Sequence, residues 1–131
     1  MKKILLFTLF ASIALLPNIN ISQAHAAVSK AFCMISGFKT WDDYPHTPAP
    51  ASYTVNLTTG GTATMVVYGD PLDPDYITVD GYVMSVSHTN HSFDGMETIE
   101  EWTGTVNGTP MRYRARQIYS YLTLQGWYGN L

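Results

Sequence analysis

The sequence lacks a cysteine pair. Cys33 is the only cysteine among the 131 residues, so no disulfide can form within the chain, and a zinc site built on paired cysteines is excluded. The fold must therefore be stabilised by its hydrophobic core. We expect Cys33 itself to be a small buried residue at the start of a strand, with an intermolecular disulfide as the alternative.

Positive charge is also scarce. Seven Lys and Arg stand against ten Asp and Glu, which gives a formal net charge of −3. Two of these cations, Lys2 and Lys3, lie at the extreme N-terminus, so the rest of the chain is more acidic still. Because basic surface supplies most of the energy of binding to phosphate backbones, we expect no nucleic acid partner.

No apolar run is long enough to cross a bilayer, which needs about 20 residues. The run from Ile4 to Leu16 follows two lysines and precedes Ala24-His25-Ala26, which offers small residues at the positions that signal peptidase reads. We therefore predict a cleavable signal peptide over residues 1–26 and one domain over 27–131. The expected location is periplasmic or secreted, with no stable membrane anchor.

A helical period is absent after residue 27, and β-forming residues alternate there instead. Three hairpin turns are indicated, at Gly60-Gly61, Asp80-Gly81 and Asn107-Gly108. With a first strand over residues 31–36 and a last strand over 118–125, the count reaches about eight. The sequence predicts an all-β fold, an antiparallel meander of about eight short strands that forms a small barrel or sandwich.

Each turn predicts which residues lie opposite one another. A two-residue turn at Gly60-Gly61 predicts Tyr53 opposite Tyr68, Val55 opposite Val66, and Leu57 opposite Thr64. The Asp80-Gly81 turn predicts Val79 opposite Tyr82, and Ile77 opposite Met84.

The Asn107-Gly108 turn predicts a hairpin with two chemically different faces. It places Trp102 opposite Tyr113 on an apolar face that we expect to be buried. Glu101 stands opposite Arg114 on the other face. Such a contrast between the faces favours this register over a slip by one residue.

Three polar or proline-rich segments, residues 44–52, 69–75 and 88–96, are predicted to be loops. The third contains His88, His91 and Asp94, side chains that zinc or copper would accept, although no fourth ligand is evident. A solvated turn is the other interpretation of this segment.

The second of these segments contains Asp70, Asp73 and Asp75, which could gather around calcium. They lack the EF-hand pattern, and the neighbouring prolines already indicate a stiff turn.

A candidate partner surface lies near the C-terminus. Arg112, Arg114 and Arg116 alternate along one strand, so they project from one face and could hold an anionic partner or form a cross-strand ladder with glutamates. The last strand is apolar on both faces, which means that it is either covered or a binding surface. The exposed aromatic candidates within residues 118–127 are Tyr119, Tyr121 and Trp127.

Catalytic motifs are missing. There is no Gly-x-Ser-x-Gly, and Glu100 and Glu101 point to opposite faces of a strand. We expect no cofactor and a non-catalytic, exported β-domain that binds a protein or glycan partner in the cell envelope or extracellular space, in the manner of an inhibitor or immunity protein. The alternatives are a β-barrel that binds a small ligand, and a metal-dependent hydrolase that uses His88, His91 and Asp94.

Overall fold

The computed structural model describes residues 34–46 and 49–129. The predicted signal peptide, its cleavage site and Cys33 lie outside this part of the chain. Within it the secondary structure consists of eight strands and no helix. They are β1 (Ile35–Trp41), β2 (Ser52–Leu57), β3 (Ala63–Asp70), β4 (Asp73–Val79), β5 (Tyr82–Phe93), β6 (Glu97–Val106), β7 (Thr109–Ile118) and β8 (Tyr121–Tyr128).

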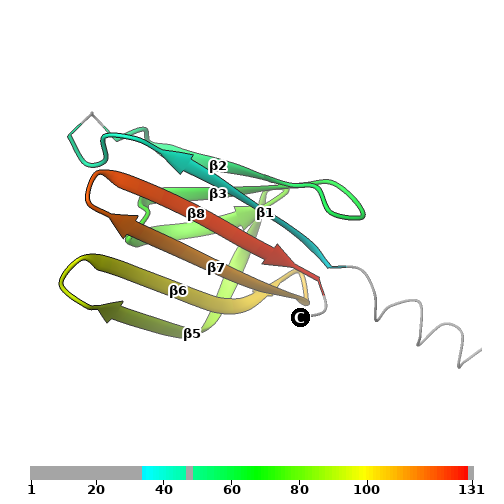
Figure 1. The fold of residues 1–131 in the computed structure, drawn as a ribbon. Coiled ribbons are helices and arrows are strands. Elements are labelled where there is room, and N and C mark those ends of the chain that lie inside the picture. Colours follow the sequence, from blue (N-terminus) through cyan, green and yellow to red (C-terminus); the bar gives the residue numbers. More distant parts are fainter. Residues whose placement is uncertain (1–33, 47–48, 130–131) are drawn as a thin grey trace, which may run out of the picture. The chain divides into compact units, whose positions relative to one another are not determined.

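The eight strands form one antiparallel sheet in the order β1-β8-β7-β6-β5-β4-β3-β2 (Figure 1). Every neighbour is consecutive in the chain except β1, which returns to pair with β8. The sheet curls into a nearly closed barrel, so β1 and β2 approach each other at the two ends of the strand order. The predicted all-β meander of about eight strands is confirmed.

The core fills the inside of this curled sheet. Because side chains alternate between faces along a strand, every second residue of β2, β3, β7 and β8 points inward. The fully buried side chains include Val55, Leu57, Met65, Val67, Ile77, Val79, Met111, Tyr113, Leu122 and Leu124. Large side chains thus occupy the interior.

Strand β5 bends and contributes to both halves of the barrel. Its first two residues pair with β4, as Val79 with Tyr82 and Thr78 with Val83, and from Met84 onward it pairs with β6. A β-bulge between Val86 and His88 accompanies this change of direction. The prediction of Val79 opposite Tyr82 is confirmed, but the ladder ends before Ile77 can pair with Met84.

The first hairpin has a different register from the predicted one. Val55 lies opposite Met65 and Leu57 opposite Ala63, because five residues, not two, separate β2 from β3. The observed pairs are Tyr53 with Val67, Val55 with Met65, and Leu57 with Ala63. A shift of one residue exchanges the two faces of a strand, which is why Met65 and Val67 are buried here.

The third hairpin confirms its predicted register, with Trp102 opposite Tyr113 and Glu101 opposite Arg114. Tyr113 is buried as expected, whereas Trp102 is partly exposed. The terminal strands differ from expectation. The first runs on to Trp41, and the last begins at Tyr121 because Tyr119, with a φ of 51°, turns the chain after β7.

Two of the predicted loops are largely strand. Residues 88–93 belong to β5, because this polar segment pairs with β6 from His88 to Phe93. The proline-rich segment after Tyr68 leaves only Pro71 and Leu72 between β3 and β4. Pro74 is tolerated within β4 near the start of that strand.

Candidate binding surface on the outer face of the sheet

The three alternating arginines lie on the outer face of β7, as their spacing predicts. Arg114 is opposite Glu101 and Arg112 is opposite Thr103 on β6. On the other side, Arg112 is opposite Trp127 and Arg114 is opposite Gln125 of β8. The sheet therefore brings the arginine row and Trp127 together.

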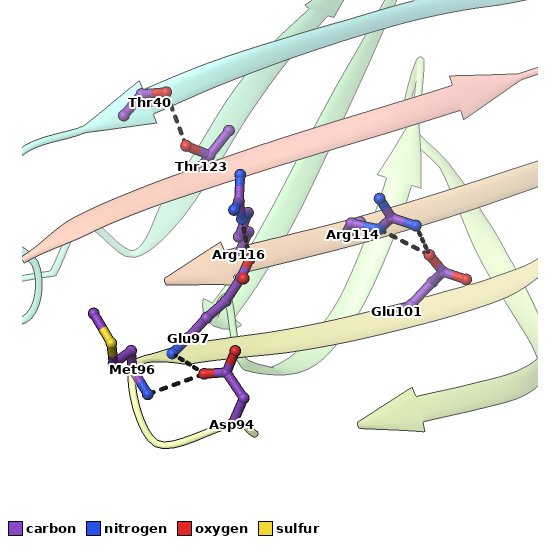
Figure 2. A network of polar contacts seen from close by, with 8 residues as sticks. All are labelled: Thr40, Asp94, Met96, Glu97, Glu101, Arg114, Arg116 and Thr123. Atoms are coloured by element: carbon purple, nitrogen blue, oxygen red, sulfur yellow. Dashed lines mark hydrogen bonds and ion pairs between the residues drawn. The ribbon is translucent and has the colours of Figure 1, made fainter. Parts of the chain in front are cut away.

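Two of the arginines are paired with carboxylates (Figure 2). Arg114 contacts Glu101, with Nη2 to Oε2 at 2.7 Å and Nε to Oε2 at 2.9 Å. Arg116 pairs with Glu97, and this hydrogen bond raises the pKa of the Arg116 guanidinium. The ladder interpretation therefore holds for these two positions. Ion pairs on a solvent-accessible sheet face contribute little to stability, typically below about 1 kcal/mol.

Arg112 differs from its two neighbours. Among the described residues it makes no ion pair, and its buried Nε has no hydrogen-bond partner. Its guanidinium carbon lies 4.2 Å from the centre of the Trp127 ring, and that of Arg114 lies 5.5 Å from the same centre. Trp127 thus serves as a cation–π platform for two arginines, one of which has no counter-charge.

A fourth residue of this surface, Phe38, is a residue that sequence reasoning missed. It lies on β1 opposite Gln125, one step along the face from Trp127, and 71% of its surface is exposed. Phe38 lies beyond Ser36, where the sequence predicts the end of the first strand, so the predicted alternation does not reach it. We call the set Phe38, Arg112, Arg114 and Trp127 the Arg–Trp patch.

The other two predicted aromatic residues lie at the opposite end of this face. Tyr121 is exposed at the start of β8, opposite Ile118. Tyr119 is exposed in the turn between β7 and β8, where its backbone oxygen accepts a hydrogen bond from the Gln117 amide at 3.0 Å. Of the three predicted aromatic residues, Trp127 is the one that makes a cation–π contact with the arginines in the described part of the chain.

Other predicted ligand groups

The proposed metal ligands are not brought together. His88 lies opposite Thr103, on the outer face, while His91 is three residues further along the strand and lies on the inner face opposite Glu100. The His91 Nδ1 is 2.8 Å from Glu100 Oε2. No three His, Cys, Asp or Glu side chains within the described ranges are grouped to hold a metal.

Asp94 instead stabilises the turn between β5 and β6. Its Oδ1 accepts hydrogen bonds from the backbone N–H groups of Glu97 at 2.8 Å and Met96 at 3.0 Å (Figure 2). These bonds lower the pKa of the Asp94 carboxyl, because they favour its charged form. The Asp94 side chain thus hydrogen-bonds locally within the turn, as the solvated-turn interpretation expects.

Asp70 of the candidate calcium set has partners within the fold. Its Oδ1 accepts hydrogen bonds from the Tyr44 hydroxyl at 2.7 Å and from the Leu72 N–H at 2.9 Å. The carboxylate thereby orders the turn between β3 and β4 and ties it to the segment that follows β1.

No family model, curated protein or solved structure matches this chain in sequence or fold comparison. Among the described residues there is also no helix of the length and apolarity that a membrane span requires.

Proposed function

We propose that this chain is an exported, non-catalytic β-domain that binds a protein or glycan partner through the Arg–Trp patch. The observation that carries the proposal is Arg112, an arginine without a carboxylate partner that stacks on Trp127 while its two neighbours are neutralised by glutamates. The leader-like residues 1–26 support the exported location.

The patch has the chemistry of a recognition surface. A guanidinium that stacks on an indole keeps its N–H groups in its own plane, where they can donate to a carboxylate or to sugar hydroxyls. Trp127 and Phe38 add rigid apolar area, which is typical of the central residues of protein interfaces and of sugar-binding platforms. A partner with an acidic or hydroxyl-rich group beside an apolar one fits this arrangement.

The two alternative functions receive less support. The inward positions of the sheet carry large, fully buried side chains such as Tyr113, Met65 and Leu122. These side chains give no specific support to a barrel that binds a small ligand in its interior. The hydrolase interpretation required His88 and His91 to share a site, and they lie on opposite faces of β5.

Binding by the purified chain tests the proposal. We expect Phe38→Ala and Arg112→Gln each to weaken binding to an envelope protein or to glycans on an array by about tenfold, which corresponds to ~1.4 kcal/mol. Both side chains project from a strand surface, so their loss should change the free energy of unfolding little.

Tyr82→Ala is the matched control, because Tyr82 is a similarly exposed aromatic residue on the β4–β5 hairpin, outside the patch. It should leave binding unchanged. If every ligand bound by the wild type were bound equally well by Phe38→Ala and Arg112→Gln, the patch would not be the recognition surface.

A further inference from the structure

The second half of β5 is an open edge of the sheet. Beyond Val83, β4 no longer pairs with β5. In the described part of the chain, no strand pairs with the edge of residues 87–93 that faces away from β6. Figure 1 shows this half of β5 at the margin of the sheet, with β6 on one side only. Both faces of the segment are exposed as well.

The backbone groups that face this open side can be identified. The Asp94 N–H donates to the Glu97 oxygen at 3.2 Å, so Asp94 and Glu97 are a hydrogen-bonded pair of the β5–β6 ladder. In an antiparallel ladder such pairs alternate with pairs whose backbone groups point away. The N–H and C=O groups of Thr89, His91 and Phe93 therefore point to the open side.

This edge lacks the features that normally prevent strand addition. Natural proteins protect long edges with lysine, proline, inward charges or very short strands. Residues 87–93 contain no proline, lysine, arginine, aspartate or glutamate. The one bulge of this strand lies at the beginning of the segment, between Val86 and His88.

We propose that the open edge of β5 pairs with the same edge of a second copy of this chain, antiparallel and centred on Asn90, to form a dimer with one continuous sheet. Centring on Asn90 uses the whole edge, because Ser87 then meets Phe93 of the other copy. The pairs are Ser87 with Phe93, His88 with Ser92, Thr89 with His91, and Asn90 with Asn90.

A second copy fits this edge for two reasons. A twofold axis at Asn90 places the outward N–H and C=O groups of Thr89 opposite those of His91 in the other copy. The same two residues therefore satisfy the hydrogen-bonding groups of both strands. The chain is acidic overall, yet this edge has no carboxylate of its own, and the nearby Glu100 is only 13% exposed behind His91. Like-charge repulsion between two copies is therefore weak along this edge.

Disulfide trapping tests the register. In a Cys33→Ser background, Asn90→Cys places one thiol from each copy beside the twofold axis. The two residues form a pair whose backbone groups do not hydrogen-bond between the copies. The Cα atoms of such a pair lie about 4.5 Å apart, within the range of about 4.4 to 6.8 Å that disulfides span. We expect oxidation to yield a covalent dimer.

Ser85→Cys in the same background is the matched control, because Ser85 is an exposed residue of β5 before the open edge. It should remain monomeric on a non-reducing gel. Cross-linking of both variants to the same extent would show random collision and would overturn the proposal, as would the absence of cross-linking in both.

Sedimentation equilibrium of the purified chain provides an independent test. The wild type should associate to a dimer, and Asn90→Lys should dissociate it, because two ammonium groups would face each other on the axis. Ser85→Lys adds the same charge elsewhere and should leave the dimer intact. A wild type that stays monomeric at about 100 μM, or a dimer that survives Asn90→Lys, would overturn the proposal without affecting the partner site on the outer face.

Discussion

Tyr113 joins two walls of the barrel. Its ring is fully buried on β7, and its hydroxyl donates a hydrogen bond of 2.5 Å to the backbone oxygen of Pro71, in the turn between β3 and β4. Burial raises the pKa of Tyr113 well above its ordinary value, and the negative charge of Asp70 acts in the same direction. Burial also raises the pKa of Tyr53. The folded state therefore favours neutral tyrosines.

A prediction about alkaline stability follows from Tyr113. Below about pH 10 the tyrosine is protonated in both states, so this contribution is fully present. Above that pH the unfolded chain loses the proton while the folded protein retains it, and stability falls until the folded pKa is reached. We expect the free energy of unfolding to decrease by up to about 1.4 kcal/mol per pH unit from this residue alone.

Urea denaturation of the wild type and Tyr113→Phe between pH 8 and 11.5 measures this effect. The variant should lose stability more gradually above pH 10, although it is less stable at neutral pH by about 1 to 3 kcal/mol because the Pro71 carbonyl loses its donor. Tyr119→Phe, at an exposed position, should follow the wild type. Identical slopes for the wild type and Tyr113→Phe would contradict the buried, neutral phenol.

At the scale of elements, the hairpins differ in how well the sequence predicts them. The β6–β7 hairpin has one polar and one apolar face, so only one register separates Glu101 and Arg114 from Tyr113. In the β2–β3 hairpin, β3 carries apolar residues at consecutive positions, Met65, Val66 and Val67. Its pattern is compatible with two registers, and the loop length decides between them.

The sequence predicts a loop for the second half of β5 for a related reason. Its residues from Ser87 to Ser92 are all polar, so no alternation of apolar and polar residues marks them as a strand. Residues His88 to Ser92 adopt strand geometry because they pair with residues Ile99 to Thr103 of β6. Pairing with β6 outweighs local β-propensity here, and the local sequence pattern does not reveal that pairing.

The close approach of β5 and β6 at the bulge supports a second prediction. A Cβ atom at Gly104 would collide with the backbone oxygen of Ser85 on β5. Gly104→Ala must therefore push the two strands apart, and we expect it to lower the free energy of unfolding by about 1 to 3 kcal/mol, as overpacking does elsewhere.

Gly61→Ala is the control for this substitution. A Cβ at Gly61 would meet only a methyl carbon of Ile35 at 3.6 Å, an ordinary contact, and its backbone is not in the left-handed region. Thermal or urea unfolding of the two variants should separate them clearly. If Gly104→Ala were as stable as Gly61→Ala, the strands would not approach as closely as the structure shows.

At the scale of the whole molecule, the curvature of the sheet determines what each face can do. The meander order and the outward arginine row follow from turn signals and alternation in the sequence. The contact of Arg112 with Trp127 depends on β8 lying beside β7 in one particular register, and the position of Phe38 depends on β1 returning to pair with β8. Such long-range pairings leave no local signal.

The two ends of the sheet meet at the seam between β1 and β2, and glycine makes this close approach possible. A Cβ at Gly37 would collide with the backbone oxygen of Asn56 on β2. The Ser36 oxygen also accepts a hydrogen bond from the Thr58 N–H at 3.4 Å. No side chain separates the two backbones at this point.

Gly37→Ala should therefore open the seam while the remaining sheet stays paired. We expect a loss of about 1 to 3 kcal/mol in the free energy of unfolding, and faster hydrogen exchange at the Thr58 amide than in the wild type. Amides of the β6–β7 ladder should keep their protection relative to global unfolding. Ser36→Ala retains the backbone oxygen and should leave the Thr58 exchange rate unchanged. If Gly37→Ala preserved both stability and Thr58 protection, the two ends of the sheet would not be in contact, and the molecule would be an open curved sheet.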